Sequence, residues 1–228
     1  MSQTILALDA STEALSLALL HQDKLYHFFE VCPQQHSQRI LDEIDALLKQ
    51  ANCDIQDVDV IGYCQGPGSF TGVRISVSVA QGLAFATKTP VIGVSSLAMM
   101  AQQAISERGA STVLAAIDAR MGEVYLGAYE EKDGLAQLVG EQQVLEPAAV
   151  TSPFSAAVAV GTGWQTYTDL AGSLSQVEVD KEITLPDSRY MLPLLASEFA
   201  KGNVADAASA QPVYVRDTVT WKKLPGRE

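Results

Sequence analysis

A glycine-rich turn at residues 66–72 (GPGSFTG) is the stretch of the sequence best suited to hold an anion. It follows an apolar run typical of a strand and precedes a long run without helix breakers. Backbone N–H groups at such a turn point at the helix start, where an anion can bind. Glycines also let two backbones approach each other closely. Because Arg74 is the only basic residue beside the turn, we interpret it as a close-approach turn.

Two aspartates, Asp9 and Asp118, each end an apolar run of strand type, and they are 109 positions apart. At the same offset the neighbouring residues match in kind: Ile5 with Leu114, Leu8 with Ile117, Ala10 with Ala119, Leu15 with Val124, and Leu17 with Leu126. Each half therefore begins with a strand, an aspartate, a turn and a second strand. We predict a duplicated chain whose two lobes face each other across a cleft.

Residues for hydrolytic or redox catalysis are scattered along the chain. The three histidines, His21, His27 and His36, stand apart, and the chain has no GxSxG motif. No nucleophile and base can therefore be paired from the sequence. The three cysteines are spaced without a CxxC pair, as is typical of reduced thiols in a cytosolic protein.

The charge balance excludes one class of partner and favours another. With 27 acidic against 15 basic residues, the net charge is −12. Such a chain repels nucleic-acid phosphates and is attracted to a basic partner. No apolar run reaches membrane-spanning length, and the first residues do not form a signal peptide. We therefore expect a cytoplasmic protein with no membrane partner.

Hydrophobic periodicity predicts an α/β protein with mixed sheets flanked by helices. For the first half it predicts an antiparallel meander of three strands and two later strands, at residues 5–9, 15–19, 25–31, 58–64 and 90–94. It predicts helices at 37–52, with Ser37 as N-cap, at 70–86 and at 96–107. The run 70–86 also alternates as a strand would, but it is too long for one. In the second half we predict strands at 113–118, 140–145, 158–160 and 211–216 and a helix at 188–201.

These elements divide the chain into two lobes and a tail. We place an N-terminal lobe at residues 1–108 and a C-terminal lobe at 109–216, whose last helix can pack on either lobe. Residues 217–228 form a basic tail with Trp221, Lys222 and Lys223. That tail is interpreted either as a frayed end or as a segment that orders on a partner.

The two helices at 37–52 and 70–86 carry more apolar residues than one sheet requires, which predicts a partner interface. The predicted interface residues are Ile40, Ile44, Leu47, Leu48, Phe70, Gly72, Val73, Ser76, Val77 and Ala80. Two such helices from each of two like-folded subunits could form a four-helix contact. The alternative is that both apolar stripes are simply core.

Four motifs together resemble the TsaB (YeaZ) family of bacterial tRNA threonylcarbamoyladenosine biosynthesis proteins. They lie at residues 5–12, 66–74, 118–125 and 212–216, so that the resemblance covers nearly the whole chain. The resemblance implies a two-lobed actin-like ATPase (ribonuclease H-like) fold. It also implies a nucleotide site at Asp9, Ser11, Thr12, Asp118, Gly161 and Gly163. ATP or ADP with Mg²⁺, at or near the partner interface, is the candidate cofactor, and the alternative is that these turns are inherited without their ligand.

The resemblance further implies a catalytic partner of the same fold, TsaD, and a small ATPase, TsaE. TsaD-type proteins hold a metal with a His-x-x-x-His pair, and here that place is taken by Ser96 and Met100, which are poor ligands. We therefore expect no metal site and no catalytic residue. The expected function is a non-catalytic subunit that binds and activates TsaD, forms a homodimer when alone, and meets tRNA only through the complex. The alternative is an ATP-binding hydrolase or a peptidase-like enzyme.

Overall fold

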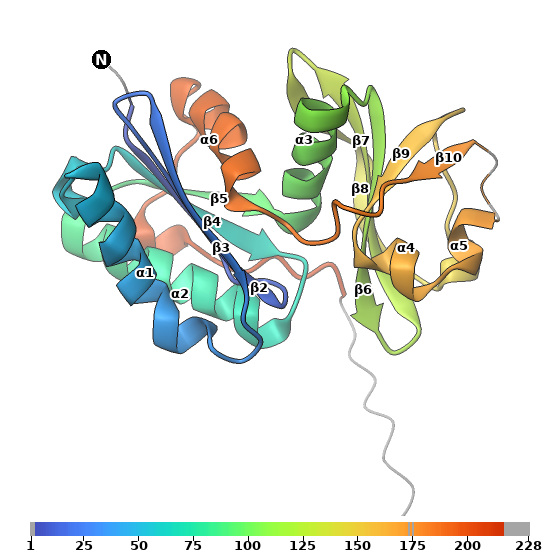
Figure 1. Cartoon of the computed structure of the whole chain (residues 1–228), viewed down its shortest axis with the longest axis horizontal. Helices are drawn as coiled ribbons and strands as arrows, with labels where there is room; N and C mark the ends of the chain where they lie inside the picture. The colour runs from blue at the N-terminus through green and yellow to red at the C-terminus, as the bar shows by residue number, and fades with distance from the viewer. Residues whose placement is uncertain (1–2, 173, 175, 217–228) are drawn as a thin grey trace, which may run out of the picture.

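The computed structural model describes residues 3–172, 174 and 176–216 of the chain. The basic tail predicted at 217–228 lies outside these residues. Two five-stranded sheets stand side by side, and helices lie on both faces of each sheet (Figure 1). Among the described residues, none of the helices combines the length and the apolarity that crossing a bilayer requires.

The first sheet has the strand order β3-β2-β1-β4-β5. β1 (Ile5–Asp9), β2 (Ala14–His21) and β3 (Lys24–Val31) form the predicted antiparallel meander. β4 (Val60–Gly66) pairs in parallel with β1, and β5 (Val91–Ser95) pairs in parallel with β4. β1 is buried along its whole length, which explains why its sequence is apolar at both alternating positions up to Asp9.

The second sheet repeats this order as β8-β7-β6-β9-β10. β6 (Thr112–Arg120), β7 (Glu123–Lys132) and β8 (Leu135–Leu145) are antiparallel, whereas β9 (Ala157–Val160) and β10 (Val177–Val179) continue the sheet in parallel. The shared order and directions confirm the predicted duplication. They also match the two-lobed actin-like fold that the resemblance implies.

Two long helices cover the outer face of the first sheet. α1 (His36–Ala51) ends at Asn52, whose backbone is left-handed, and α2 (Phe70–Thr87) begins after Ser69, whose hydroxyl accepts a hydrogen bond from the Gly72 N–H. The predicted cap at Ser37 is wrong, because α1 already begins at His36 and its N-cap Gln35 makes no side-chain hydrogen bond. A 3₁₀ turn, η1 (Ile55–Asp57), precedes β4.

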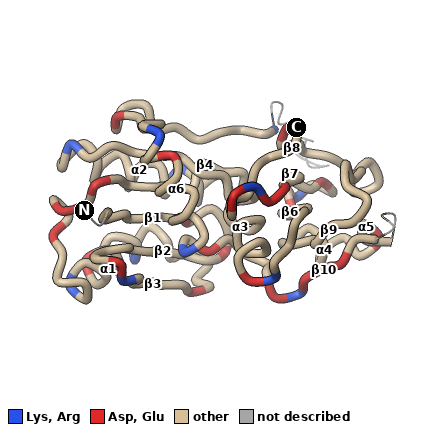
Figure 2. Tube along the Cα trace, turned by 90° about the horizontal axis from the view of Figure 1, so that it is seen from above, with Lys and Arg blue, Asp and Glu red and all other residues tan. Residues whose placement is uncertain are grey.

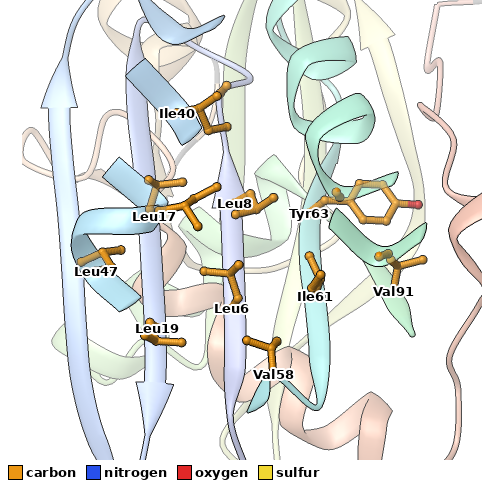
Figure 3. Packing of buried hydrophobic residues seen from close by; sticks show 14 of the residues in the cluster. Leu6, Leu8, Leu17, Leu19, Ile40, Leu47, Val58, Ile61, Tyr63 and Val91 are labelled. Atoms are coloured by element: carbon orange, nitrogen blue, oxygen red, sulfur yellow. The ribbon is translucent and has the colours of Figure 1, made fainter. Parts of the chain in front are cut away.

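The largest buried cluster lies between these helices and the first sheet. Figure 3 shows Ile40 and Leu47 of α1 beside the leucines of β1 and β2. β2 and β4 contain no charged residue, whereas many turns and helices carry red or blue segments in Figure 2.

Two helices exchange sides between the lobes. α3 (Ser96–Arg108) follows the first sheet in sequence, but its residues Leu97, Met100 and Ile105 pack in the cluster of the second sheet. α6 (Met191–Ala200), entered through η3 (Ser188–Tyr190), returns to the inner face of the first sheet with Met191 and Leu195 (Figure 1). The division at residue 108 stays a prediction.

The second lobe has shorter helices on its outer face. η2 (Pro147–Ala149), α4 (Thr162–Thr166) and α5 (Asp169–Gly172) take the place of long helices there. Trp164 of α4 is buried, and its indole N–H donates to the Leu114 carbonyl at 3.2 Å. This bond fixes α4 against β6.

The strand predicted at 211–216 is wrong, because this described stretch forms none. It follows η4 (Ala207–Ser209) and crosses from the first lobe to the second. The Val213 N–H donates to the Gln65 carbonyl at 2.8 Å, and Arg216 bonds to the Ala119 carbonyl and to Glu123. We call this stretch the bridging segment, because its hydrogen bonds connect the first lobe to the second.

The glycine-rich turn brings α2 against the turn between β1 and β2. A Cβ atom on Gly72 would lie 2.0 Å from the Ala10 carbonyl oxygen, and one on Gly68 would lie 2.4 Å from the Ser11 carbonyl oxygen. The Ser69 N–H donates to that Ser11 oxygen at 2.7 Å, and the Ala10 N–H donates to Ser76 Oγ at 2.8 Å. The interpretation of a close-approach turn is confirmed.

Gly72→Ala should lower the free energy of unfolding by about 2–4 kcal/mol, because the new methyl group meets a backbone oxygen that cannot move aside. Gly82→Ala on the same helix is the matched control. A Cβ there has no neighbour within 4 Å among the described residues, so alanine should stabilise the helix by about 0.5–1 kcal/mol. Urea unfolding followed by circular dichroism measures both, and equal effects would contradict the close approach.

Candidate functional site

A cleft of about 990 Å³ lies between the lobes. Its walls come from the β1–β2 turn, the glycine-rich turn, the start of α1, the β6–β7 turn and the bridging segment at 213–216. Three of the six predicted nucleotide-site residues line it: Ser11, Thr12 and Asp118. The nucleotide site itself stays a prediction.

Asp9 lies beneath the β1–β2 turn and is completely buried, outside the residues that line the cleft in the described chain. Its Oδ1 accepts the Ser11 N–H at 2.9 Å, and Oδ2 has no partner at normal geometry among the described residues. Burial raises the pKa of Asp9 to about 6, although hydrogen bonds from Ser11 oppose the rise. Burial also raises the pKa of the neighbouring Cys64 thiol. Asp9 thus supports the turn from below.

Asp118 faces the cleft but is already engaged. Its carboxylate accepts from the Arg120 N–H at 2.9 Å, from Arg120 Nη1 at 3.1 Å and from the Tyr167 hydroxyl at 3.1 Å. Arg120 reaches across the cleft to Glu13 Oε1 at 3.0 Å. The two aspartates that match in sequence therefore have different roles, since one is buried below its turn and the other anchors an arginine.

The two glycines predicted to pass a nucleotide serve packing. Gly161 has φ +103°, and a Cβ on it would lie 2.2 Å from the Ala116 carbonyl oxygen. A Cβ on Gly163 would lie 2.9 Å from Ala116 Cβ. Both glycines let α4 approach β6, and it is Thr162, between them, that lines the cleft.

Ser96 and Met100, at the positions compared with a histidine pair, both take part in packing. Ser96 Oγ donates to the Pro67 carbonyl and Met100 is fully buried among apolar residues of α3 and the second sheet. Within the described part of the chain, no three histidine, cysteine, aspartate or glutamate residues lie close enough together to hold a metal ion.

Nine of the ten predicted interface residues are buried against the chain's own sheet or its β1–β2 turn, so that the prediction is wrong for them. They are Ile40, Ile44, Leu47, Leu48, Gly72, Val73, Ser76, Val77 and Ala80. The alternative interpretation, a core stripe, is confirmed for these nine. Phe70 is the exception, with 69% of its surface exposed.

Other apolar residues of the same helices face outward. Leu41 is 56% exposed and Phe85 is 82% exposed. A groove of about 370 Å³ runs between the two helices, lined by Ser37, Ile40, Leu41, Phe70, Thr71, Arg74, Ile75, Ser78 and Val79. Leu41 was missed because it lies at the edge of the apolar stripe of α1, where helical spacing does not tell a covered residue from an exposed one.

Arg74 does not serve the glycine-rich turn as a phosphate partner. Its guanidinium stacks on the Phe70 ring, 3.2 Å from the centroid, and lies 5.4 Å from the centroid of the Tyr214 ring. It also donates to the Phe70 carbonyl and to the Tyr214 hydroxyl. This stack joins the start of α2 to the bridging segment.

A second buried acid anchors the entry to α6. Asp187 Oδ1 lies 3.2 Å from His27 Nε2, and Oδ2 accepts from Arg189 Nη2 at 2.7 Å. Burial opposes ionisation of Asp187, but His27 and Arg189 outweigh it and hold its pKa at about 2. Ser188 beside it makes two hydrogen bonds of 2.8 Å to Ser16 of β2.

Asp9→Asn should raise the free energy of unfolding at pH 8 by about 1–3 kcal/mol. The folded chain raises the pKa of Asp9 to about 6, so its ionised form opposes folding above that pH. The gain should shrink as the pH falls below 6 and vanish near about 4, where Asp9 is protonated in both states. Urea unfolding over a pH series measures it.

Asp187→Asn is the matched control with the opposite sign. The pKa of Asp187 is lowered to about 2, so its charge stabilises the fold above about pH 4 and this contribution is lost as the pH falls toward 2. The variant should lose about 1–3 kcal/mol at pH 7. A gain from Asp9→Asn that is the same at pH 4 and pH 8 would contradict the role given to Asp9.

Comparisons with known proteins identify the family. The family model described as TsaD, tRNA N6-adenosine threonylcarbamoyltransferase, matches residues 29–217. The chain is 44% identical to the tRNA threonylcarbamoyladenosine biosynthesis protein TsaB of Escherichia coli strain K12, over 98% of this chain and 99% of that protein. It is 40% identical to TsaB of Haemophilus influenzae, over 99% and 98%.

Solved structures agree with the sequence relatives. A structure described as YeaZ from Pseudomonas aeruginosa superposes with a TM-score of 0.88 at 44% identity, covering 93% of this chain and 99% of that chain. Another from the same organism, described as an uncharacterized protein with similarity to peptidase YEAZ, has the same TM-score and identity and covers 94% and 100%. The chain therefore belongs to the TsaB (YeaZ) family, within the wider group that the TsaD model describes.

Proposed function

We propose that this chain takes part in tRNA threonylcarbamoyladenosine biosynthesis as a non-catalytic subunit that binds and activates TsaD. TsaD would carry out the transfer of the threonylcarbamoyl group to the adenosine beside the anticodon. TsaE would join the assembly, and tRNA would be reached through the complex in the cytoplasm. The observation that carries this proposal is an exposed apolar face on two helices of a chain whose cleft offers no paired catalytic groups among the described residues.

The side chains at the positions compared with catalytic relatives support a non-catalytic role. Ser96 and Met100 are buried in packing, and Asp118 is held by Arg120 and Tyr167. Ser11 is completely buried, and its hydroxyl faces the buried carboxyl of Asp9, whose ionised form it favours. The carboxyl that engages this hydroxyl lies beneath the turn and outside the lining of the cleft.

The outer face of α1 and α2 supports a partner of the same fold. Ser78, Gly82 and Ala86 are exposed and spaced four apart along α2, so they form a shallow row into which another helix can pack closely. Leu41 and Phe85 flank this row with exposed apolar side chains. A second pair of helices placed here would give a four-helix contact, and a specific contact needs about 1,200–2,000 Å² in total.

The same face offers a homodimer contact when TsaD is absent. In a twofold dimer, the outer face of α1 and α2 on one copy would pack against the same face of the second copy. Because TsaD and a second copy would compete for one surface, adding TsaD should dissociate the homodimer. The contact would be shared by both partners.

An enzymatic function is the second candidate, because one solved relative is described as similar to a peptidase. It would require turnover by the isolated chain. The purified protein should then hydrolyse ATP or a peptide and lose this activity in a cleft variant such as Asp118→Asn. We expect no turnover above background.

Leu41→Glu should abolish co-purification with TsaD and lower tRNA modification by the reconstituted proteins at least tenfold. The new charge would be buried without a partner at the centre of the proposed contact. Because Leu41 is 56% exposed, the isolated chain should stay folded, with an unchanged melting temperature. Size-exclusion chromatography with light scattering would follow the homodimer in the same samples.

Gln50→Glu is the control, since it adds the same charge to an exposed position on the far side of α1. It should bind TsaD as the unchanged chain does. Full binding by Leu41→Glu, or modification activity without this chain, would refute the proposal. Substituting Ile44 or Val77 would not test it, because both are core residues whose replacement by a charge unfolds the chain.

A further inference from the structure

We propose that the free edge of β3 is a second contact between copies of this chain, in which the β3 strands of two copies pair antiparallel about a twofold axis at His27. The contact goes beyond the partnership with TsaD and uses a surface distinct from the outer face of α1 and α2. It would join the first sheets of the two copies into one continuous sheet.

β3 differs from the other sheet edges of the described chain because it is both long and regular. It pairs with β2 through eight consecutive residues, 24–31, without a register shift, and in Figure 2 it lies at the margin of the first lobe. β5 is bridged by Ala205, which exchanges hydrogen bonds of 2.9 and 3.0 Å with Val91. β10 has three residues, and the pairing of β8 with β7 contains a register shift. Short, covered or bulged edges resist pairing with another chain, whereas a regular edge offers a row of N–H and C=O groups.

The inner face of β3 carries an uncovered apolar row. Leu25, Phe29 and Val31 alternate along the strand and are 49%, 39% and 56% exposed. α6 covers the inner face of the first sheet over β1, β4 and β5. Tyr26 and Phe28, on the opposite face of β3, pack against the cluster beneath α1. An exposed apolar row on an edge strand favours pairing with a further strand.

The sequence of β3 is complementary to itself when two copies run in opposite directions. An antiparallel pair centred on His27 places residues at equal distances from the centre opposite each other and on the same face. The facing pairs are Lys24 with Glu30, Leu25 with Phe29, and Tyr26 with Phe28. The outer pairs therefore join opposite charges and the inner pairs join apolar side chains, and each pair occurs twice in the dimer. This complementarity selects a second copy of the chain as the occupant of the edge.

The neighbouring charges allow this pairing. Glu30 accepts two hydrogen bonds from Arg39, at 2.6 and 2.9 Å, but a carboxylate has about four acceptor positions and can also bind Lys24 of the second copy. His27 would face its own copy, and its Nε2 lies 3.2 Å from Asp187 Oδ1, so that this carboxylate balances a proton on the ring. Because the whole chain carries a net charge of −12, self-association has to rest on local complementarity of this kind.

The test measures the mass of the full chain by analytical ultracentrifugation in the Leu41→Glu background, in which the outer face of α1 and α2 is blocked. This chain should still form dimers through β3. Lys24→Glu and Glu30→Lys each place like charges opposite each other at both ends of the contact, so each should weaken the dimer about tenfold. An equimolar mixture of the two variants should restore the dimer, because an acidic strand then faces a basic one.

Leu25→Lys in the same background should weaken the dimer at least tenfold, because it places a charge opposite Phe29 of the second copy. Leu25 is half-exposed, so the melting temperature should not change. Leu138→Lys is the matched control, since it adds the same charge to an exposed leucine on the edge strand β8. It should form dimers as the background chain does.

The proposal fails under any of three results. The first is a Leu41→Glu chain that is monomeric at high micromolar concentration. The second is a dimer that Leu25→Lys leaves intact, which would place the contact elsewhere. The third is a monomeric background chain together with a loss of TsaD binding in Leu25→Lys, which would assign the edge of β3 to TsaD. Binding of TsaD to the outer face of α1 and α2 is measured separately through Leu41→Glu, so it can hold where the β3 contact fails.

Discussion

The close approach of α2 to the β1–β2 turn is the constraint on which the first lobe depends. The Ala10 carbonyl occupies the space of a side chain at residue 72, and Ser76 one turn later accepts the Ala10 N–H. The row of small residues continued by Ala80 and Ala84 faces inward and is buried. In sequence, this row of small residues is typical of a contact between two helices. In the structure it lets α2 lie directly on the β1–β2 turn. It also fixes the wall of the cleft, because the same turn carries Ser11.

The duplication preserved the sheets more than the helices. Both sheets have one order and one set of directions, but the second lobe has the short α4 and α5 where the first has α1 and α2. The two lobes exchange helices: α3 follows the first sheet in sequence but packs on the second, and α6 follows the second sheet but packs on the first. Separating them would expose both helices' apolar faces. The long outer helices are therefore the part of the molecule in which the two halves differ most.

The sequence predicted most of the strands, the long helices and the duplication, because periodicity and a repeated strand–aspartate pattern report burial directly. It missed the short strand β10 and predicted a strand at 211–216 that the structure does not have. It could not tell what covers a buried face, so Ile44 and Val77 were assigned to a partner although the chain's own sheet covers them. Leu41 lies at the edge of the same apolar stripe, and only the structure shows that the sheet leaves it exposed. In the cleft, the matching aspartates Asp9 and Asp118 gave no sign that one is buried and the other is held by an arginine, because that depends on residues distant in sequence.

The cleft and the outer groove are two sides of the same helix starts. Ser37, Phe70 and Thr71 line both, and Arg74 joins Phe70 to the bridging segment that closes the cleft at Tyr214. A ligand that orders these residues from inside would change the surface that a partner meets outside. Linkage requires the reverse as well, so that a partner on the groove would alter affinity in the cleft by the same factor. The packing of these two helix starts thus couples the lining of the cleft to the outer surface of the same helices.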